Sequence, residues 1–144
     1  MAACTTCERR EAFFSRSYSG ERLCRKCFCE SVERRVRTTI SRYEMLEPDD
    51  RTAVAVSGGK DSVSLLHIMA SIEKGFPKAS LCAVMVNEGI KGYRDEAMRI
   101  AVRNFRKLGV EYTTVSFEDL YGHALDEIVA MSRDSKLTPC SYCG

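Results

Sequence analysis

The sequence feature that most constrains the fold is a short apolar run that leads directly into a glycine loop. Residues 53–56 are all apolar, as in a β-strand that is buried on both faces. The run continues into Ser57-Gly58-Gly59-Lys60-Asp61-Ser62, and apolar residues at helical spacing follow this loop. A strand, a glycine loop and a helix in this order expose backbone N–H groups at a helix N-terminus, where an anion is stabilised. The segment therefore predicts an anion-binding site at the end of a buried strand.

Strands and helices alternate along residues 49–144. The predicted elements are, in chain order, strand 53–56, a helix that ends at Gly75-Phe76-Pro77, strand 81–86, helix 93–108, strand 112–115 and a helix around 122–133. The strand at 112–115 is the most polar of the three, which places it near an edge of the sheet. Because the links are short, this alternation predicts an α/β fold with a doubly wound parallel sheet.

The glycine loop differs from two common nucleotide-binding loops. No glycine stands five residues before Gly59, so the G-x-x-x-x-G-K-[ST] pattern is not met, and G-x-G-x-x-G is not met either. The loop therefore disfavours a kinase-type transfer of a γ-phosphoryl group. Its side chains still suit phosphate, because Ser57 and Ser62 offer hydroxyl donors and Lys60 offers a mobile positive charge.

Cysteines are the second informative feature, because six of the eight form three C-x-x-C pairs. Sixteen residues separate the first pair, Cys4 and Cys7, from the second, Cys24 and Cys27, which is close to the ligand spacing of tetrahedral zinc sites. We predict a structural zinc ion in a small ribbon over residues 1–29, with a β-hairpin between the pairs and Cys29 outside the ligand set. Two disulfides are the alternative, which the lack of a secretory signal makes weaker.

Residues 30–48 predict a helix that links the ribbon to the α/β part. Its apolar residues recur at intervals of three and four, its arginines occupy the other faces, and Pro48 ends it. Residues 1–47 carry 10 Lys and Arg against 7 Asp and Glu, whereas residues 48–144 carry 12 against 13. In the simpler interpretation the helix packs its apolar stripe on the next domain. In the second, its arginines also contact a nucleic-acid backbone.

The composition fits an ordinary globular protein, with 44% hydrophobic and 29% charged residues over 144 positions. These proportions exclude an intrinsically disordered chain. No window of about 18 residues is apolar throughout, which excludes a membrane-spanning helix. We therefore expect a cytoplasmic protein without a membrane partner.

The glycine loop and the residues before it, Ala55 to Ser62, closely resemble the PP-loop of the ATP pyrophosphatases, which split ATP into AMP and pyrophosphate. Two further segments, Asn87 to Asp95 and Pro139 to Gly144, narrow the resemblance when they are taken with the front cysteines. The chain then resembles, over essentially its whole length, the tRNA 2-thiouridine synthetases, most of all the archaeal and eukaryotic cytoplasmic branch that thiolates the wobble uridine. The resemblance implies an adenine nucleotide α-hydrolase-like fold behind a zinc ribbon and a linker helix.

The resemblance also implies roles for the loop. It implies ATP binding by Ala55, Ser57, Gly58, Gly59, Lys60, Asp61, Ser62 and Val86. The adenine would lie near Ala55 and Val86, the phosphates on the loop, and a magnesium ion near Asp61. Lys60 would be catalytic, because it would stabilise the charge that develops when the 2-oxygen of a uridine attacks the α-phosphate. Pyrophosphate leaves, and sulfur then replaces AMP to give 2-thiouridine.

The third pair, Cys140 and Cys143, is expected to act beside the ATP, because it lies in a loop beyond a helix at the carboxyl ends of the strands. Three interpretations stay open: a redox pair that carries a persulfide, two of three ligands to a 4Fe–4S cluster, or half of another zinc site. The resemblance favours the cluster, with the third cysteine beyond Gly144. Both residues would then be catalytic.

Two departures from the wobble branch matter. Asn87 stands where that branch has an acid, so a carboxylate role there would pass to Glu88 or be absent. A later Gly-His-Asn-x-Asp-Asp motif, a third cluster cysteine and a second zinc knuckle do not occur in residues 1–144, so we expect an incomplete family member that is inactive alone. The expected partners are tRNA, a sulfur donor (a ubiquitin-like thiocarboxylate carrier or sulfide) and, for the full-length form, a second copy.

Three other functions remain as alternatives. The first is 2-thiolation of a ribothymidine in the T-loop of tRNA by the same chemistry, as in the sister branch. The second keeps the loop but changes the acceptor, as in lysidine or GMP synthesis, whose enzymes lack the front knuckle and the late C-x-x-C. The third is an inactive zinc-knuckle RNA-binding module whose α/β part serves as a scaffold.

Overall fold

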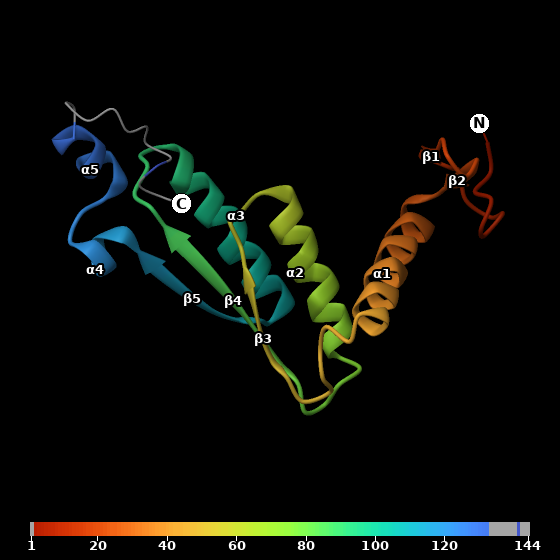
Figure 1. Ribbon diagram of the computed structural model, residues 1–144. Helices are drawn as coiled ribbons and strands as arrows, with labels where there is room; N and C mark the ends of the chain where they lie inside the picture. Colours follow the sequence, from red (N-terminus) through yellow and green to blue (C-terminus); the bar gives the residue numbers. More distant parts are fainter. Residues whose placement is uncertain (1, 133–140, 142–144) are drawn as a thin grey trace. The chain divides into compact units, whose positions relative to one another are not determined.

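The structure is a computed structural model that describes residues 2–132 and Ser141 (Figure 1). It divides into two compact units, Met1–Glu47 and Pro48–Gly144, and each is described by itself. No helix in the described part of the chain is long and apolar enough to cross a membrane.

The N-terminal unit is a β-hairpin followed by one long helix. Strand β1 (Phe14–Arg16) pairs antiparallel with β2 (Glu21–Leu23), which confirms the hairpin predicted between the two cysteine pairs. The buried guanidinium of Arg16 ties the hairpin to the helix, because it contacts Glu21 Oε2 at 2.6 Å and donates to Ser31 Oγ at 3.0 Å. The other buried side chains in the described part of this unit are Cys4, Leu23, Cys24 and Cys27.

Helix α1 (Arg25–Arg42) begins and ends earlier than the predicted range 30–48. It begins directly after Cys24, so the second cysteine pair forms its first turn, and charged residues there hide the helical periodicity. It ends in a Schellman motif, in which Glu44 is left-handed with φ 48° and Met45 N–H donates to the carbonyl oxygen of Ile40 at 3.0 Å. Pro48 therefore does not end the helix.

The C-terminal unit has the predicted α/β fold with a parallel sheet. Its strands lie in the order β3 (Arg51–Ala55), β4 (Ser80–Asn87) and β5 (Glu111–Ser116), so the most polar strand is at an edge of the described sheet. The helices of this unit are α2 (Lys60–Glu73), α3 (Tyr93–Leu108), α4 (Phe117–Tyr121) and α5 (Leu125–Met131).

The helix predicted around 122–133 is α5, which lies within that range, and it is preceded by a short helix, α4, that was not predicted. Helix α4 begins directly after β5, where Ser116 and Asp119 form a capping box. It ends at Gly122, whose left-handed φ of 78° interrupts the helix. The prediction missed α4 because five residues are too few to show a helical period.

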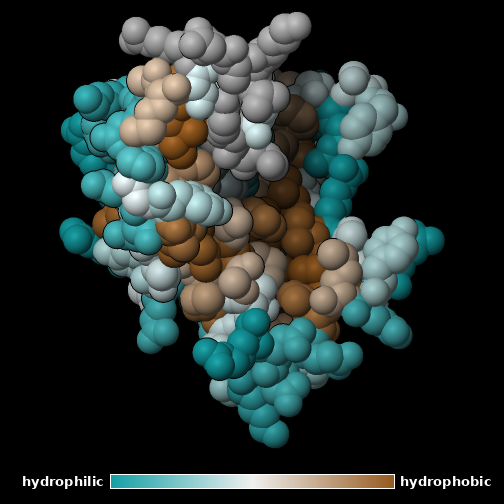
Figure 2. Space-filling view, turned by 60° about the vertical axis from the view of Figure 1, so that its left-hand side comes forward, coloured by the Kyte–Doolittle hydropathy of each residue, from teal (hydrophilic) through white to brown (hydrophobic). Residues whose placement is uncertain are grey.

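One face of the sheet is covered by α2 and α3, which lie side by side (Figure 1). Along β4, Leu81, Ala83 and Met85 are buried, whereas Cys82 and Val84 on the opposite face stay half-exposed. The order β3-β4-β5 contains no reversal, so the reversal that a doubly wound sheet needs is not among the three described strands. Figure 2 shows a broad apolar area on the side of the molecule that it presents.

Candidate functional site

The glycine loop lies at the carboxyl edge of the parallel sheet. Strand β3 leads into Ser57, β4 ends at Asn87 and β5 ends at Ser116, so the three strand ends meet at one edge. Helix α2 begins at Lys60 with Gly59 as N-cap, and no side chain caps its first turn. The N–H groups of this turn are therefore available to an anion at the edge of the sheet.

Two serines of the loop are hydrogen-bonded to each other. Ser57 N–H donates to Ser62 Oγ at 3.2 Å, and the two hydroxyl oxygens lie 3.1 Å apart. Ser62 Oγ also donates to the carbonyl oxygen of Gly59 at 3.2 Å. The structure thus brings two of the predicted phosphate donors together, and their bonds hold the loop in its open turn.

Gly58 is the point at which the loop touches helix α3. Its φ is 88°, and a Cβ built there would lie 2.4 Å from the backbone oxygen of Ala97. Both observations require glycine, because an L side chain is strained at that φ and no space exists for it. A Cβ at Gly59 would meet only Ser57 Oγ, at 3.5 Å. The two glycines, which are alike in the sequence, therefore differ in what the fold demands of them.

Lys60 and Asp61 stand at the outer rim of the loop. Lys60 Nζ lies 2.6 Å from Asp61 Oδ1, and both side chains are almost fully exposed. An exposed ion pair of this kind contributes little, so the lysine can exchange its partner for a phosphate oxygen at small cost. Ala55 and Val86 are exposed on the neighbouring strands β3 and β4, and they present an apolar surface next to the loop.

Arg94, which sequence reasoning did not select, is the central side chain beneath the loop. Its side chain is only 8% exposed, and its Nε lies 2.6 Å from Glu88 Oε2. Nη1 donates to the carbonyl oxygen of Ser57 at 3.2 Å, and Nη2 donates to that of Val86. Arg94 therefore joins the ends of β3 and β4. A signal was present in the sequence, because a cation in the first turn of a helix opposes the helix dipole and so points to another role.

Asn87 and Glu88 have internal partners in the loop that follows β4. Asn87 Oδ1 accepts from Gly89 N–H at 3.1 Å, and the carbonyl oxygen of Glu88 accepts from Leu125 N–H at 2.7 Å. The Glu88 carboxylate is paired with Arg94. The Glu88 carboxylate, which could have replaced an acid at position 87, therefore has a structural role as the partner of Arg94.

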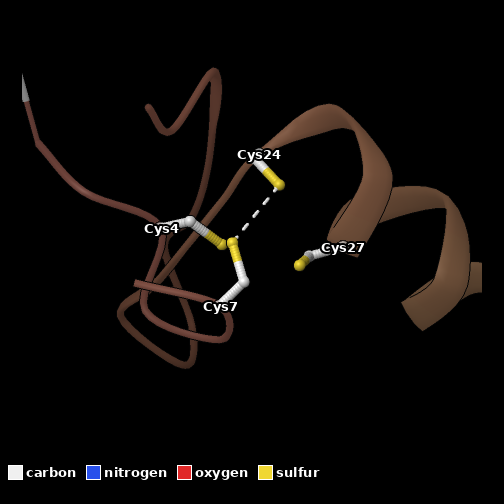
Figure 3. A group of neighbouring side chains, drawn as sticks. All are labelled: Cys4, Cys7, Cys24 and Cys27. Carbon is white, nitrogen blue, oxygen red and sulfur yellow. Dashed lines mark hydrogen bonds between the residues drawn. The ribbon is translucent and has the colours of Figure 1, made fainter. Parts of the chain in front are cut away.

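The four front cysteines converge on one point in the N-terminal unit (Figure 3). Their sulfurs all lie within 4.8 Å of one another, and the Cys7 and Cys24 sulfurs are 3.9 Å apart. Four thiolates at about 2.3 Å from a zinc ion form a tetrahedron with edges of about 3.8 Å. The cluster therefore fits a closed tetrahedral metal site. Cys29 is exposed and lies outside this set, as predicted.

Hydrogen bonds prepare two of these sulfurs for the thiolate form. Backbone N–H groups of Cys24 and Cys7 lower the pKa of the Cys4 thiol to about 6. The backbone N–H of Cys27 lowers the pKa of Cys24, and the Arg10 guanidinium lowers it further. Burial raises the pKa of Cys27 to about 12. Because a buried thiolate at Cys27 needs a cation beside it, the chemistry of the donor set also fits a bound metal ion.

The third cysteine pair, Cys140 and Cys143, lies outside the described residues. Of the predicted site residues, the structure brings those of the loop together at one edge of the sheet, and it brings the four front cysteines together in the N-terminal unit.

Comparison with protein families finds that residues 29–136 match the family described as PP-loop domain. Among curated proteins, the chain is 34% identical over 142 residues to cytoplasmic tRNA 2-thiolation protein 1 of Aspergillus niger, covering 98% of this chain and 41% of the relative. It is 36% identical over 147 residues to the tRNA 2-thiolation protein NcsA of Haloferax volcanii, covering 98% and 45%.

Among solved structures, the chain matches the U34-tRNA thiolase NcsA from Methanococcus maripaludis with its [4Fe-4S] cluster. The TM-score is 0.84 at 36% identity, and the match covers 100% of this chain and 46% of that one. The chain thus spans about two-fifths of the length of the curated relatives it matches.

Proposed function

The chain belongs to the PP-loop domain family, and on this premise we propose that it binds ATP at the loop from Ser57 to Ser62. We further propose that the whole protein uses this ATP to convert the wobble uridine of a tRNA into 2-thiouridine in the cytoplasm. One observation carries the proposal: an open glycine loop at the carboxyl edge of a parallel sheet, in a chain that matches proteins named for tRNA 2-thiolation over 98% of its length.

The proposed reaction has two displacement steps. In the first, the 2-oxygen of the uridine attacks the α-phosphorus of ATP, the bond between the α-phosphorus and the bridging oxygen breaks, and pyrophosphate leaves. In the second, sulfur attacks C2 of the adenylated base, the C2–O bond breaks, and AMP leaves with the former uridine oxygen. The protein's share of this chemistry is positioning and electrostatic stabilisation.

The loop residues divide this work by their positions. The free N–H groups at the start of α2 and the hydroxyls of Ser57 and Ser62 hold the phosphates, and Gly58 and Gly59 let them approach the backbone. Lys60 would leave Asp61 and stabilise the charge that develops on the phosphates, and Asp61 would then be free to hold the magnesium ion that accompanies ATP. Ala55 and Val86 receive the adenine on their exposed apolar surface.

We propose zinc for the four-cysteine site. A closed set of four thiolates suits a structural zinc ion, because no ligand position is left open for chemistry. The ribbon over residues 1–29 would therefore position the rest of the N-terminal unit and take no part in the sulfur transfer.

We propose that Cys140 and Cys143 supply two of three thiolate ligands to a 4Fe–4S cluster. The C-x-x-C spacing and the cluster in the archaeal thiolase support this assignment. When bound, the cluster would hold the incoming sulfur at an iron without a protein ligand. The sulfur donor, either a ubiquitin-like thiocarboxylate carrier or sulfide, and a dimeric full-length form belong to the same proposal.

Exchange of labelled pyrophosphate into ATP tests the proposed function in the whole protein. Exchange should require tRNA, and Lys60→Ala should reduce its rate by about 100-fold, a typical loss for one charge-stabilising group. Lys74→Ala is the matched control, because Lys74 is an exposed lysine at the other end of α2. Mass spectrometry of the digested tRNA then locates the sulfur, at the wobble position or in the T-loop. Normal thiolation by Lys60→Ala would refute the assignment.

A further inference from the structure

An open hollow lies beside the cysteine cluster in the N-terminal unit. Phe13 lines it together with three basic side chains, Arg10, Arg25 and Lys26, and with one carboxylate, Glu11. Its volume of about 570 Å³ is within the range of sites that bind small organic groups. All five of these side chains are exposed, so the hollow is open to solvent.

The ring of Phe13 is exposed and held in a fixed orientation. It is 56% exposed although it is fully apolar. Phe28 packs edge-on against it, with ring centroids 5.7 Å apart at 85°, and Phe13 N–H donates to the carbonyl oxygen of Leu23 at 3.0 Å. The Arg25 guanidinium lies over the ring, 5.7 Å from its centroid. A rigid aromatic ring beside a guanidinium plane is a surface on which a nucleobase stacks.

The charges around the ring favour an anionic ligand. The hollow is lined by three cations and one carboxylate. The ion pair between Lys26 and Glu30 is long, at 3.7 Å, and both of its side chains are exposed. Arg25 and Lys26 are therefore available to phosphate oxygens next to a stacked base.

We propose that this hollow holds one unpaired nucleotide of the RNA substrate, outside the uridine that reacts. The base stacks on Phe13 and Arg25, and Lys26 contacts the adjoining phosphate. The inference rests on the proposed function, which supplies the RNA partner. The exposed ring favours RNA over an acidic protein segment, since a carboxylate-rich peptide would use the cations but leave the ring face unused.

Fluorescence anisotropy of a labelled tRNA transcript, titrated with the chain at several salt concentrations, tests this assignment. Phe13→Ala should weaken binding roughly 5- to 150-fold, the range for one base stacked on an aromatic ring, and should leave the slope of log K against log salt unchanged. Phe13→Leu, which keeps the apolar packing on Phe28, should lose nearly as much. Arg25→Ala should weaken binding as well, because it removes the second stacking surface, and Lys26→Ala should lower the slope by about 0.7, the value for one phosphate of a single strand.

The matched control is Tyr43→Ala. Tyr43 is 67% exposed and Arg42 lies over its ring at 5.9 Å, as Arg25 does over Phe13, but Tyr43 does not line the hollow. This variant should bind tRNA within about twofold of the wild type. Zinc content and circular dichroism of each variant confirm that the ribbon is intact.

Unchanged tRNA affinity in Phe13→Leu and Arg25→Ala would overturn the inference and leave the proposed function standing, provided that tRNA-dependent pyrophosphate exchange is normal. A different result would assign the hollow to an acidic protein instead. In that case a polyglutamate peptide would compete with tRNA equally well in the wild type and in Phe13→Leu, and Phe13→Leu would bind tRNA as the wild type does. If the wild type showed no pyrophosphate exchange but Phe13→Leu still bound tRNA more weakly than the wild type, the result would support the nucleotide site in the hollow and count against the proposed reaction.

Discussion

The two units of the chain differ in what stabilises the fold of each. In the N-terminal unit, the buried cluster is Leu23 with Cys4, Cys24 and Cys27, and Cys7 and Phe28 pack against it. In the C-terminal unit, apolar side chains such as Leu66, Met85 and Phe105 fill the space between sheet and helices. A unit that ends at Glu47 is too small to fold on so few apolar contacts alone, and we propose that a metal ion bound by the four cysteines supplies the missing stability. Metal loss and core mutation should therefore damage different units.

The largest effect is expected from Cys24→Ser, which tests that contrast directly. Binding of structural zinc supplies about 10–16 kcal/mol of folding free energy, so loss of one buried ligand should abolish zinc binding and unfold the hairpin. The C-terminal unit should keep its fold. Zinc content measures the first effect, and amide NMR signals assigned to each unit measure the second.

Cys29→Ser is the control for this prediction, because Cys29 is exposed and lies outside the ligand set. It should retain one zinc ion for each chain. Equal loss of zinc in both variants would contradict the four-ligand site, and loss of signals from β3 to β5 in Cys24→Ser would show that the units do not fold independently.

The second-largest effect is expected from Gly58→Ala in the C-terminal unit. A left-handed alanine costs about 1–2 kcal/mol, and the collision with the Ala97 backbone adds about 2 kcal/mol, so the free energy of unfolding should fall by about 3.5 kcal/mol. ATP affinity should fall as well, because the loop has to move off α3. Urea unfolding and ATP titration measure the two effects.

Gly59→Ala is the matched control, because a Cβ there meets only the Ser57 hydroxyl at 3.5 Å. Its free energy of unfolding should change by less than about 1 kcal/mol. If both variants were equally destabilised, the contact with Ala97 would not be what requires glycine at position 58.

Local patterns in the sequence predicted most of the fold of the C-terminal unit. The helix predicted at 93–108 is α3 with the same bounds, and the strands predicted at 81–86 and 112–115 fall within β4 and β5. Helix α3 has a long apolar period and β4 a buried run, whereas the exposed strand β5 is marked by its tyrosine, threonine and valine residues, and all of these signals are local. The start of α1 at Arg25 was missed because its first turn serves the metal site and carries charged residues, and its end at a left-handed Glu44 has no glycine to mark it.

The candidate site shows the same limit. The loop residues and the four cysteines could be predicted, because spacing along the chain is enough to recognise them. The partners of Arg94 and the special demand on Gly58 could not, since both depend on contacts with residues that are distant in sequence: the carbonyl of Ser57 for Arg94, and Ala97 for Gly58. Tertiary contacts of this kind leave little trace in a single sequence.

The third-largest effect is expected from Arg94, because its buried ion pair with Glu88 stabilises the unit that has the apolar core. Arg94→Met should lower the free energy of unfolding by about 3 kcal/mol, because it leaves Glu88 and two carbonyl oxygens without their partner. Arg103→Met, an exposed arginine on the same helix, is the control. The double variant Glu88→Gln with Arg94→Met should recover part of the loss, and additive losses would mean that the ion pair contributes nothing.

The smallest effect is expected at Asn87 in the C-terminal unit. This position should tolerate substitution better than the four cysteines of the N-terminal unit. Each proposed metal ligand in the N-terminal unit has to be a thiolate, whereas Asn87 provides only an acceptor oxygen to Gly89 N–H. A carboxylate offers the same acceptor, so Asn87→Asp should change the free energy of unfolding by no more than about 0.5 kcal/mol, while Asn87→Ala, which removes the acceptor, should cost about 1 kcal/mol. Urea unfolding distinguishes the two. An equal loss in both variants would show that the amide group of Asn87 also donates a bond on which the loop depends.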